Sequence, residues 1–145
     1  MKTILCLSLS LWLLACTDMG ELTVYNYTVK NESGVNLKII GYRKYGTPHI
    51  IHIVNGATVS QRYKDGLPPR GYHFSFFFGS SDGRDYADSI RVIYGNVKYK
   101  NFNYKNLNDE RNPLGPFHNS GKAEETFTFT VEDYENAEDC TGNCE

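Results

Sequence analysis

The sequence predicts an all-β domain, an antiparallel β-sandwich of immunoglobulin-like or similar type. About eight short segments are rich in aromatic and β-branched residues, and turn residues separate them at roughly ten-residue spacing. No segment sustains the 3.6-residue period of an amphipathic helix. Eleven tyrosines and eight phenylalanines among 145 residues also suit strands. A small barrel is the alternative arrangement of the same strands.

The expected strands are residues 23–30, 35–42, 49–54, 57–63, 72–78, 88–94, 97–101 and 125–131. Two dipeptides, Asn55-Gly56 and Gly95-Asn96, are strong hairpin signals, so each predicts pairing of the strands that flank it. The apolar strand over 72–78 should lie centrally, with Tyr72, Phe74, Phe76 and Phe78 on one face. Residues 102–122 should be mostly loop, and residues 132–138 should form one or two helical turns.

The N-terminus has the features of a secretory signal peptide over residues 1–15. Lys2 supplies a positive charge, and the apolar run that follows is too short to span a bilayer. Leu13-Leu14-Ala15-Cys16 then resembles the lipobox of bacterial lipoproteins. The resemblance implies cleavage before Cys16 and acylation of that cysteine, which would anchor the protein stably in a membrane. The alternative is an ordinary secreted protein with a chance cysteine.

The location follows from the same resemblance. Thr17, rather than aspartate, comes after the cysteine, and this favours the outer membrane of the cell envelope. Four further segments resemble a group of small, uncharacterised cell-envelope lipoproteins: residues 31–39, 88–94, 111–114 and 127–137. That resemblance implies an envelope location and a β-domain, and it carries no activity to transfer.

The expected organisation is a signal peptide (1–15), a lipidated cysteine with a short tether (16–22), one β-sandwich domain (23–135) and an acidic tail (136–145). Residues 124–145 hold eight acidic and no basic residues, so this segment is either solvated or folded back on basic loops. Cys140 and Cys144 are expected to form a disulfide outside the cytoplasm. Free thiols or a metal pair are the alternatives.

A stretch that interleaves lysine with aromatic residues is the candidate ligand surface, together with the loop over 109–118. Its members are Lys98, Tyr99, Lys100, Phe102, Tyr104 and Lys105. Such a stretch could bind nucleic acid in the cytoplasm, but in the envelope we expect a glycan or a protein partner and no nucleic acid. The alternative is an edge strand whose lysines face solvent and block edge-to-edge pairing.

Catalytic and metal signals are weak. Residues 79–83 fit the pattern Gly-x-Ser-x-Gly, and Ser81 with a histidine is the candidate for a hydrolase, although no helix is expected after it. His49 and His52 should point to opposite faces of a strand, and His73 and His118 have no obvious partners. Carboxylates at Asp82, Asp85, Asp88, Asp109 and Glu110 miss the EF-hand spacing for Ca²⁺.

These observations predict a non-enzymatic binding module without a metal or cofactor, anchored in the envelope and binding protein or glycan. Two alternatives remain: a structural or inhibitory accessory subunit of an envelope machine, and a hydrolase of envelope material.

Overall fold

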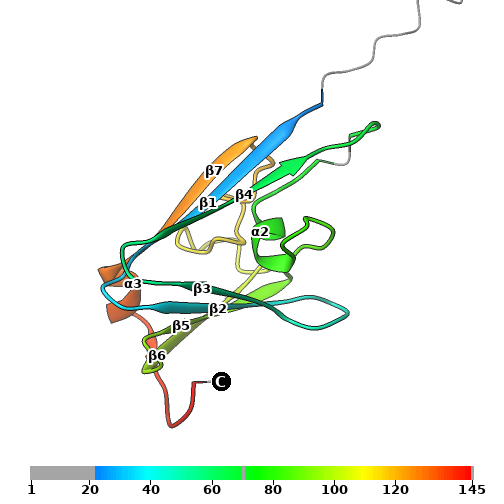
Figure 1. The fold of residues 1–145 in the computed structure, drawn as a ribbon. Helices are drawn as coiled ribbons and strands as arrows, with labels where there is room; N and C mark the ends of the chain where they lie inside the picture. Colours follow the sequence, from blue (N-terminus) through cyan, green and yellow to red (C-terminus); the bar gives the residue numbers. More distant parts are fainter. Residues whose placement is uncertain (1–21, 70, 145) are drawn as a thin grey trace, which may run out of the picture.

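The computed structural model describes residues 22–69 and 71–144, which form two β-sheets around one core (Figure 1). One sheet has the strand order β4-β1-β7 and the other β3-β2-β5-β6-β8. The prediction of an all-β sandwich is confirmed. The strands are β1 (Val24–Glu32), β2 (Leu37–Tyr42), β3 (His49–Ile53), β4 (Thr58–Lys64), β5 (Ser89–Tyr94), β6 (Lys98–Asn103), β7 (Glu124–Thr130) and β8 (Glu138–Asp139).

Residues 1–21, including the lipobox and Cys16, lie outside the described part of the chain. Within the described part, no helix is long and apolar enough to cross a membrane.

Most of the strand pairs are antiparallel. The exception is β1 with β7, which run parallel in register from Asn26 opposite Glu124 to Glu32 opposite Thr130. The predicted hairpin across Gly95-Asn96 is confirmed, because β5 and β6 pair directly. Both turn residues have positive φ, 56° at Gly95 and 60° at Asn96, as a type I′ turn requires.

The predicted hairpin across Asn55-Gly56 is wrong. β3 pairs with β2 and β4 pairs with β1, so the chain crosses from one sheet to the other at this turn. The buried Asn31 holds the crossing: its backbone N–H donates to Ala57 O at 2.9 Å, and its Nδ2 donates to Ile53 O at 2.9 Å. The turn forms, but these contacts between segments distant in sequence place the strands before and after it in different sheets.

The predicted strand over 72–78 is also wrong, because residues Ser75–Gly79 form the short helix α2 between the two sheets (Figure 1). Phe74, Phe77 and Phe78 are fully buried, and their spacing of three and four residues places them on one helical face. The helix lies directly on β2, where a Cβ at Gly41 would stand 1.8 Å from Phe78 O. A run in which nearly every residue is apolar fits both the two-residue period of a strand and the 3.6-residue period of a helix, and tertiary packing selects the helix.

The core between the sheets is built about equally from aromatic and aliphatic side chains. The strand expected over 125–131 forms as β7, where Phe127 and Phe129 are buried with their ring centroids 4.8 Å apart in an edge-to-face arrangement. The neighbouring strand β1 adds Tyr27 and Val29 to the same layer. The opposite sheet contributes a similar layer, led by Ile39, Ile53, Ile90, Val92 and Tyr94.

Residues 111–114 and 127–137 meet in space. Arg111, in the loop before β7, pairs with the Asp133 carboxylate of helix α3 (Val131–Glu135). Asp133 is 4 % exposed and also accepts the Thr130 N–H at 2.8 Å, completing a capping box. Beside Arg111, the fully buried Asn112 donates from Nδ2 to Asn103 O at 2.8 Å. These residues therefore fasten the long loop to the sandwich.

Candidate binding site

The six residues of the predicted ligand surface do not share one face. Lys98, Lys100 and Phe102 lie opposite Tyr94, Val92 and Ile90 of β5, all of which are buried in the core. Directly opposed residues share a face, so these three point inward or along the core margin. Phe102 is only 3 % exposed and belongs to the core, so it cannot form part of a ligand surface as the sequence suggested.

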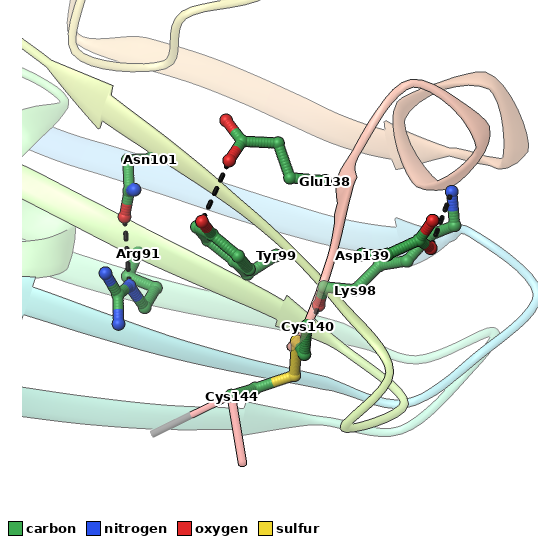
Figure 2. The surroundings of a disulfide bond; sticks show 8 residues. All are labelled: Arg91, Lys98, Tyr99, Asn101, Glu138, Asp139, Cys140 and Cys144. Carbon is green, nitrogen blue, oxygen red and sulfur yellow. Dashed lines mark hydrogen bonds and ion pairs between the residues drawn. A yellow bond between two sulfur atoms is a disulfide. The ribbon is translucent and has the colours of Figure 1, made fainter. Parts of the chain in front are cut away.

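The C-terminal segment covers the first part of this stretch (Figure 2). β8 pairs with Lys98 and Tyr99, the Tyr99 hydroxyl donates to Glu138 Oε2 at 2.8 Å, and Lys98 Nζ lies 3.4 Å from Asp139 Oδ1. Lys98 Nζ also donates to the carbonyl oxygen of Ala137 at 3.2 Å. The hydrogen bond to Glu138 raises the pKa of Tyr99. Lys98 and Tyr99 are therefore engaged within the chain.

Cys140 and Cys144 form the predicted disulfide, with their Cα atoms 5.3 Å apart. Cys144 is 4 % exposed and packs with Ile40 and Ile93 on the outer face of the larger sheet. The Cys140 N–H donates to Val97 O at 2.9 Å, next to the β5–β6 turn. The disulfide loop thus holds the acidic C-terminal segment against β6 (Figure 2).

Tyr104 has a different environment, because it lines a cavity of about 330 Å³ at the end of β6. The same cavity is lined by residues from α2, from the segment just before it, and from the segments before β5 and β7: His73, Ser75, Tyr86, Ala87, Asp88 and Asn119. Tyr86 is 52 % exposed and Tyr104 is 47 % exposed, so both rings are open to a ligand. We take this cavity as the candidate site and call it the Tyr104 pocket.

A hydrogen-bond network fixes the histidine of the Tyr104 pocket. The Ser75 backbone N–H donates to Asn119 Oδ1 at 2.9 Å, so this oxygen is an acceptor. The same Oδ1 lies 3.1 Å from His73 Nδ1, and Nδ1 must therefore carry the proton and donate. Ser75 Oγ lies 2.6 Å from the same nitrogen. Burial lowers the pKa of His73, although the bond to Asn119 opposes this shift. His73 is thus a neutral imidazole whose Nε2 is a hydrogen-bond acceptor.

Asp88 supplies the only carboxylate among the residues that line the Tyr104 pocket, and no lysine or arginine lines it. Its backbone is held on both sides: the N–H donates to Tyr42 O at 2.9 Å, and the carbonyl accepts from the Tyr104 N–H at 3.3 Å. No ion pair to the Asp88 carboxylate occurs within residues 22–69 and 71–144. The pocket therefore combines two exposed aromatic rings, two acceptors and the Asn119 amide as a donor.

Of the residues that line the Tyr104 pocket, only Tyr104 belongs to the ligand surface expected from the sequence, whereas His73 and Asp88 were considered there only as a lone histidine and as one of several carboxylates. His73, the pair Tyr86 and Asp88, and Asn119 come from three separate segments and match no spacing motif. They meet because the chain at the start of α2 places His73 and Ser75 beside the loop before β7, which carries Asn119. The nearest sequence signal was the density of asparagine, glycine and proline in 102–122, which indicated a long loop.

The Gly-x-Ser-x-Gly pattern does not form a nucleophile elbow. It begins at the last residue of α2, so a helix precedes the serines, and no helix follows before β5. Ser80 Oγ accepts the backbone N–H groups of Arg84 at 3.0 Å and Asp85 at 3.1 Å, so this hydroxyl holds a turn. Ser81 is exposed, and no hydrogen bond joins it to a histidine in the described residues. Ser75 is also unsuited to act as a nucleophile, because it and Asn119 approach the same nitrogen of His73.

The remaining histidines and carboxylates have structural partners or lie apart. His49 is half-buried and His52 is exposed, in keeping with opposite faces of β3. His118 Nδ1 lies 2.9 Å from Glu125 Oε1. Asp82 pairs with Arg84 and Asp85 pairs with Arg43. In the described part of the chain, no three histidine, cysteine or acidic side chains are grouped to hold a metal ion.

Comparison with known proteins adds no relative. No protein-family model matches the chain, and no curated protein or solved structure matches it either.

Proposed function

We propose that the protein is a non-enzymatic binding module of the bacterial cell envelope, anchored by acylation at Cys16, which binds a glycan in the Tyr104 pocket. The observation that carries this proposal is the lining of the pocket, with open Tyr86 and Tyr104 rings beside the Asp88 carboxylate. Small-ligand sites typically combine apolar or aromatic walls with a few fixed polar groups. This arrangement has both.

A saccharide fits the hydrogen-bonding groups better than other envelope ligands. Its C–H faces can pack on tyrosine rings, which are rigid and amphipathic. Its hydroxyls can donate to the Asp88 carboxylate and to Nε2 of His73, and can accept from the Asn119 amide. A phosphate or carboxylate ligand would meet the Asp88 charge with no lysine or arginine in the lining to balance it. We therefore expect a neutral sugar ring at this position.

The proposal is tested by measuring saccharide affinity for the pocket variants. Purified protein is screened against peptidoglycan fragments and lipopolysaccharide oligosaccharides, and the bound sugar is then titrated by calorimetry. We expect Tyr104→Ala to raise Kd about thirtyfold, which corresponds to about 2 kcal/mol for loss of a central aromatic contact. Asp88→Asn should weaken binding while keeping the shape of the pocket.

Tyr45→Ala is the matched control, since Tyr45 is 78 % exposed and does not line the pocket. Equal affinity in all three variants would refute the proposal.

Saccharide binding should also depend on pH through His73. Because burial lowers its pKa from the ordinary 6.5, the neutral imidazole still predominates at pH 6.5 and the protonated form predominates only in more acidic solution. Protonation converts Nε2 from an acceptor to a donor. We therefore expect affinity to fall on acidification, with a midpoint below pH 6.5. His73→Gln should flatten the profile, and a midpoint above 6.5 would contradict this role.

A further inference from the structure

The start of β1 and the loop that follows β4 lie at one end of the molecule. In the ladder between these strands, Val24 opposes Lys64, and the Asp65 N–H donates to Thr23 O at 3.0 Å. The chain thus enters the domain directly beside residues 65–69. The β3–β4 turn lies at the other end of the same ladder, where Lys30 opposes Thr58. The two ends are six residue steps apart along β1, which is about 20 Å.

The loop presents apolar side chains on a fixed backbone. The Asp65 carboxylate, 3 % exposed, accepts the backbone N–H groups of Gly66 and Gly71, each at 2.8 Å. Leu67 is nevertheless 52 % exposed, and Pro68 and Pro69 are exposed beside it. Leu22, at the start of the described chain, is 43 % exposed. The ordered loop therefore holds apolar groups in water at the end where the chain enters.

Positive charge flanks these apolar groups. Arg62 and Lys64 precede the loop on β4 and are both exposed, and they alternate with Tyr63, which is buried in the core. In the described residues, neither cation forms an ion pair with a carboxylate. Apolar residues with adjacent basic residues are the combination that binds an anionic membrane surface.

We infer that this end of the domain docks on the membrane, with Leu22, Leu67 and Pro68 among the lipid headgroups and with Arg62 and Lys64 against anionic phosphates. The inference rests on the proposed acylation of Cys16. Only five residues, 17–21, separate Cys16 from Leu22, and a linker of that length has a mean reach of about 12 Å. The anchor therefore keeps the start of β1, and the loop beside it, close to the bilayer.

The test uses spin labels on the acylated full-length protein in vesicles of phosphatidylethanolamine and phosphatidylglycerol. Labels are placed at Leu67→Cys and, in a second variant, at Pro69→Cys. The matched control is Val54→Cys, because Val54 is apolar, 61 % exposed and follows β3 at the opposite end. We expect a water-soluble nickel chelate to collide with the Leu67 and Pro69 labels several-fold less often than with the Val54 label. Omitting phosphatidylglycerol should reduce this shielding.

The outcomes separate the inference from the proposal on which it rests. If mass spectrometry confirms acylation but all three labels are equally accessible, membrane docking of this end is wrong and the anchor stands. If Cys16 is not acylated, both the membrane docking and the proposed lipid anchor are wrong. Shielding of Leu67 in vesicle-free Cys16→Ser protein would indicate contact between copies of the chain and would also overturn the inference. Shielding that is unaffected by phosphatidylglycerol would refute the role of Arg62 and Lys64.

Discussion

Replacing Gly41 with alanine is expected to destabilise the protein by about 3 kcal/mol, because the added methyl group collides with backbone. The Cβ would stand 1.8 Å from Phe78 O and 2.9 Å from the Phe78 carbonyl carbon. Neither atom can rotate away as a side-chain end could. Relief requires α2 to move off β2, and this would open the core around Phe77 and Phe78. The measurement is the free energy of unfolding from a urea titration.

The matched control is Gly66→Ala, where the added Cβ has no atom within 4 Å. Since Gly66 lies outside the left-handed region, alanine there should leave stability unchanged or slightly improve it by restricting the unfolded chain. Comparable losses in the two variants would show that α2 does not pack on β2 as described.

The second large effect is expected at Arg111. The change Arg111→Met keeps an unbranched apolar stem but removes the guanidinium, and so leaves Asp133 as a buried carboxylate without its cation. It also removes the donor to Thr128 O at 2.7 Å and the guanidinium that lies 4.7 Å from the Phe127 ring centroid. The bond to Asp133 raises the pKa of Arg111, so the cation is present at any accessible pH. We expect a loss of about 3 kcal/mol in the free energy of unfolding.

Arg84→Met is the control for this prediction. Arg84 also pairs with an aspartate, Asp82, but its side chain is 82 % exposed. Solvent screens such a pair, so its removal should leave the unfolding midpoint nearly unchanged. If Arg84→Met proved as harmful as Arg111→Met, the proposed fastening of the long loop to α3 would be wrong.

The sequence alone predicts an element correctly where its local residue pattern matches the burial and strand pairing found in the folded protein. The alternation in β7 places Phe127 and Phe129 in the core because one face of that strand is buried and the other is not. The Gly95-Asn96 turn forms a hairpin because both residues adopt the positive φ that joins two paired strands. In both cases, a few neighbouring residues contain the whole physical reason.

The sequence was insufficient where distant contacts decide. Asn55-Gly56 can form a turn whether the flanking strands pair with each other or enter different sheets. Hydrogen bonds from Asn31 to Ile53 and Ala57 hold the chain where it passes from one sheet to the other. The apolar residues over 74–78 fit the two-residue period of a strand and the 3.6-residue period of a helix equally well. The helix forms because Gly41 of β2, which has no side chain, lets the α2 backbone pack closely on the sheet. The Tyr104 pocket has no local signature at all, because its lining comes from segments that only the fold brings together.

The most direct test of the binding account is an NMR titration of ¹⁵N-labelled protein with the saccharide found in the screen. If the saccharide binds in the Tyr104 pocket, the Asn119 side-chain amide and the backbone amides of residues 86–88 and 104 should shift in proportion to saturation, while those of residues 138–140 stay fixed. Shifts centred on 98–100 and 138–140 instead would place the ligand on the surface that the C-terminal segment covers. That result would contradict the Tyr104 pocket as the binding site.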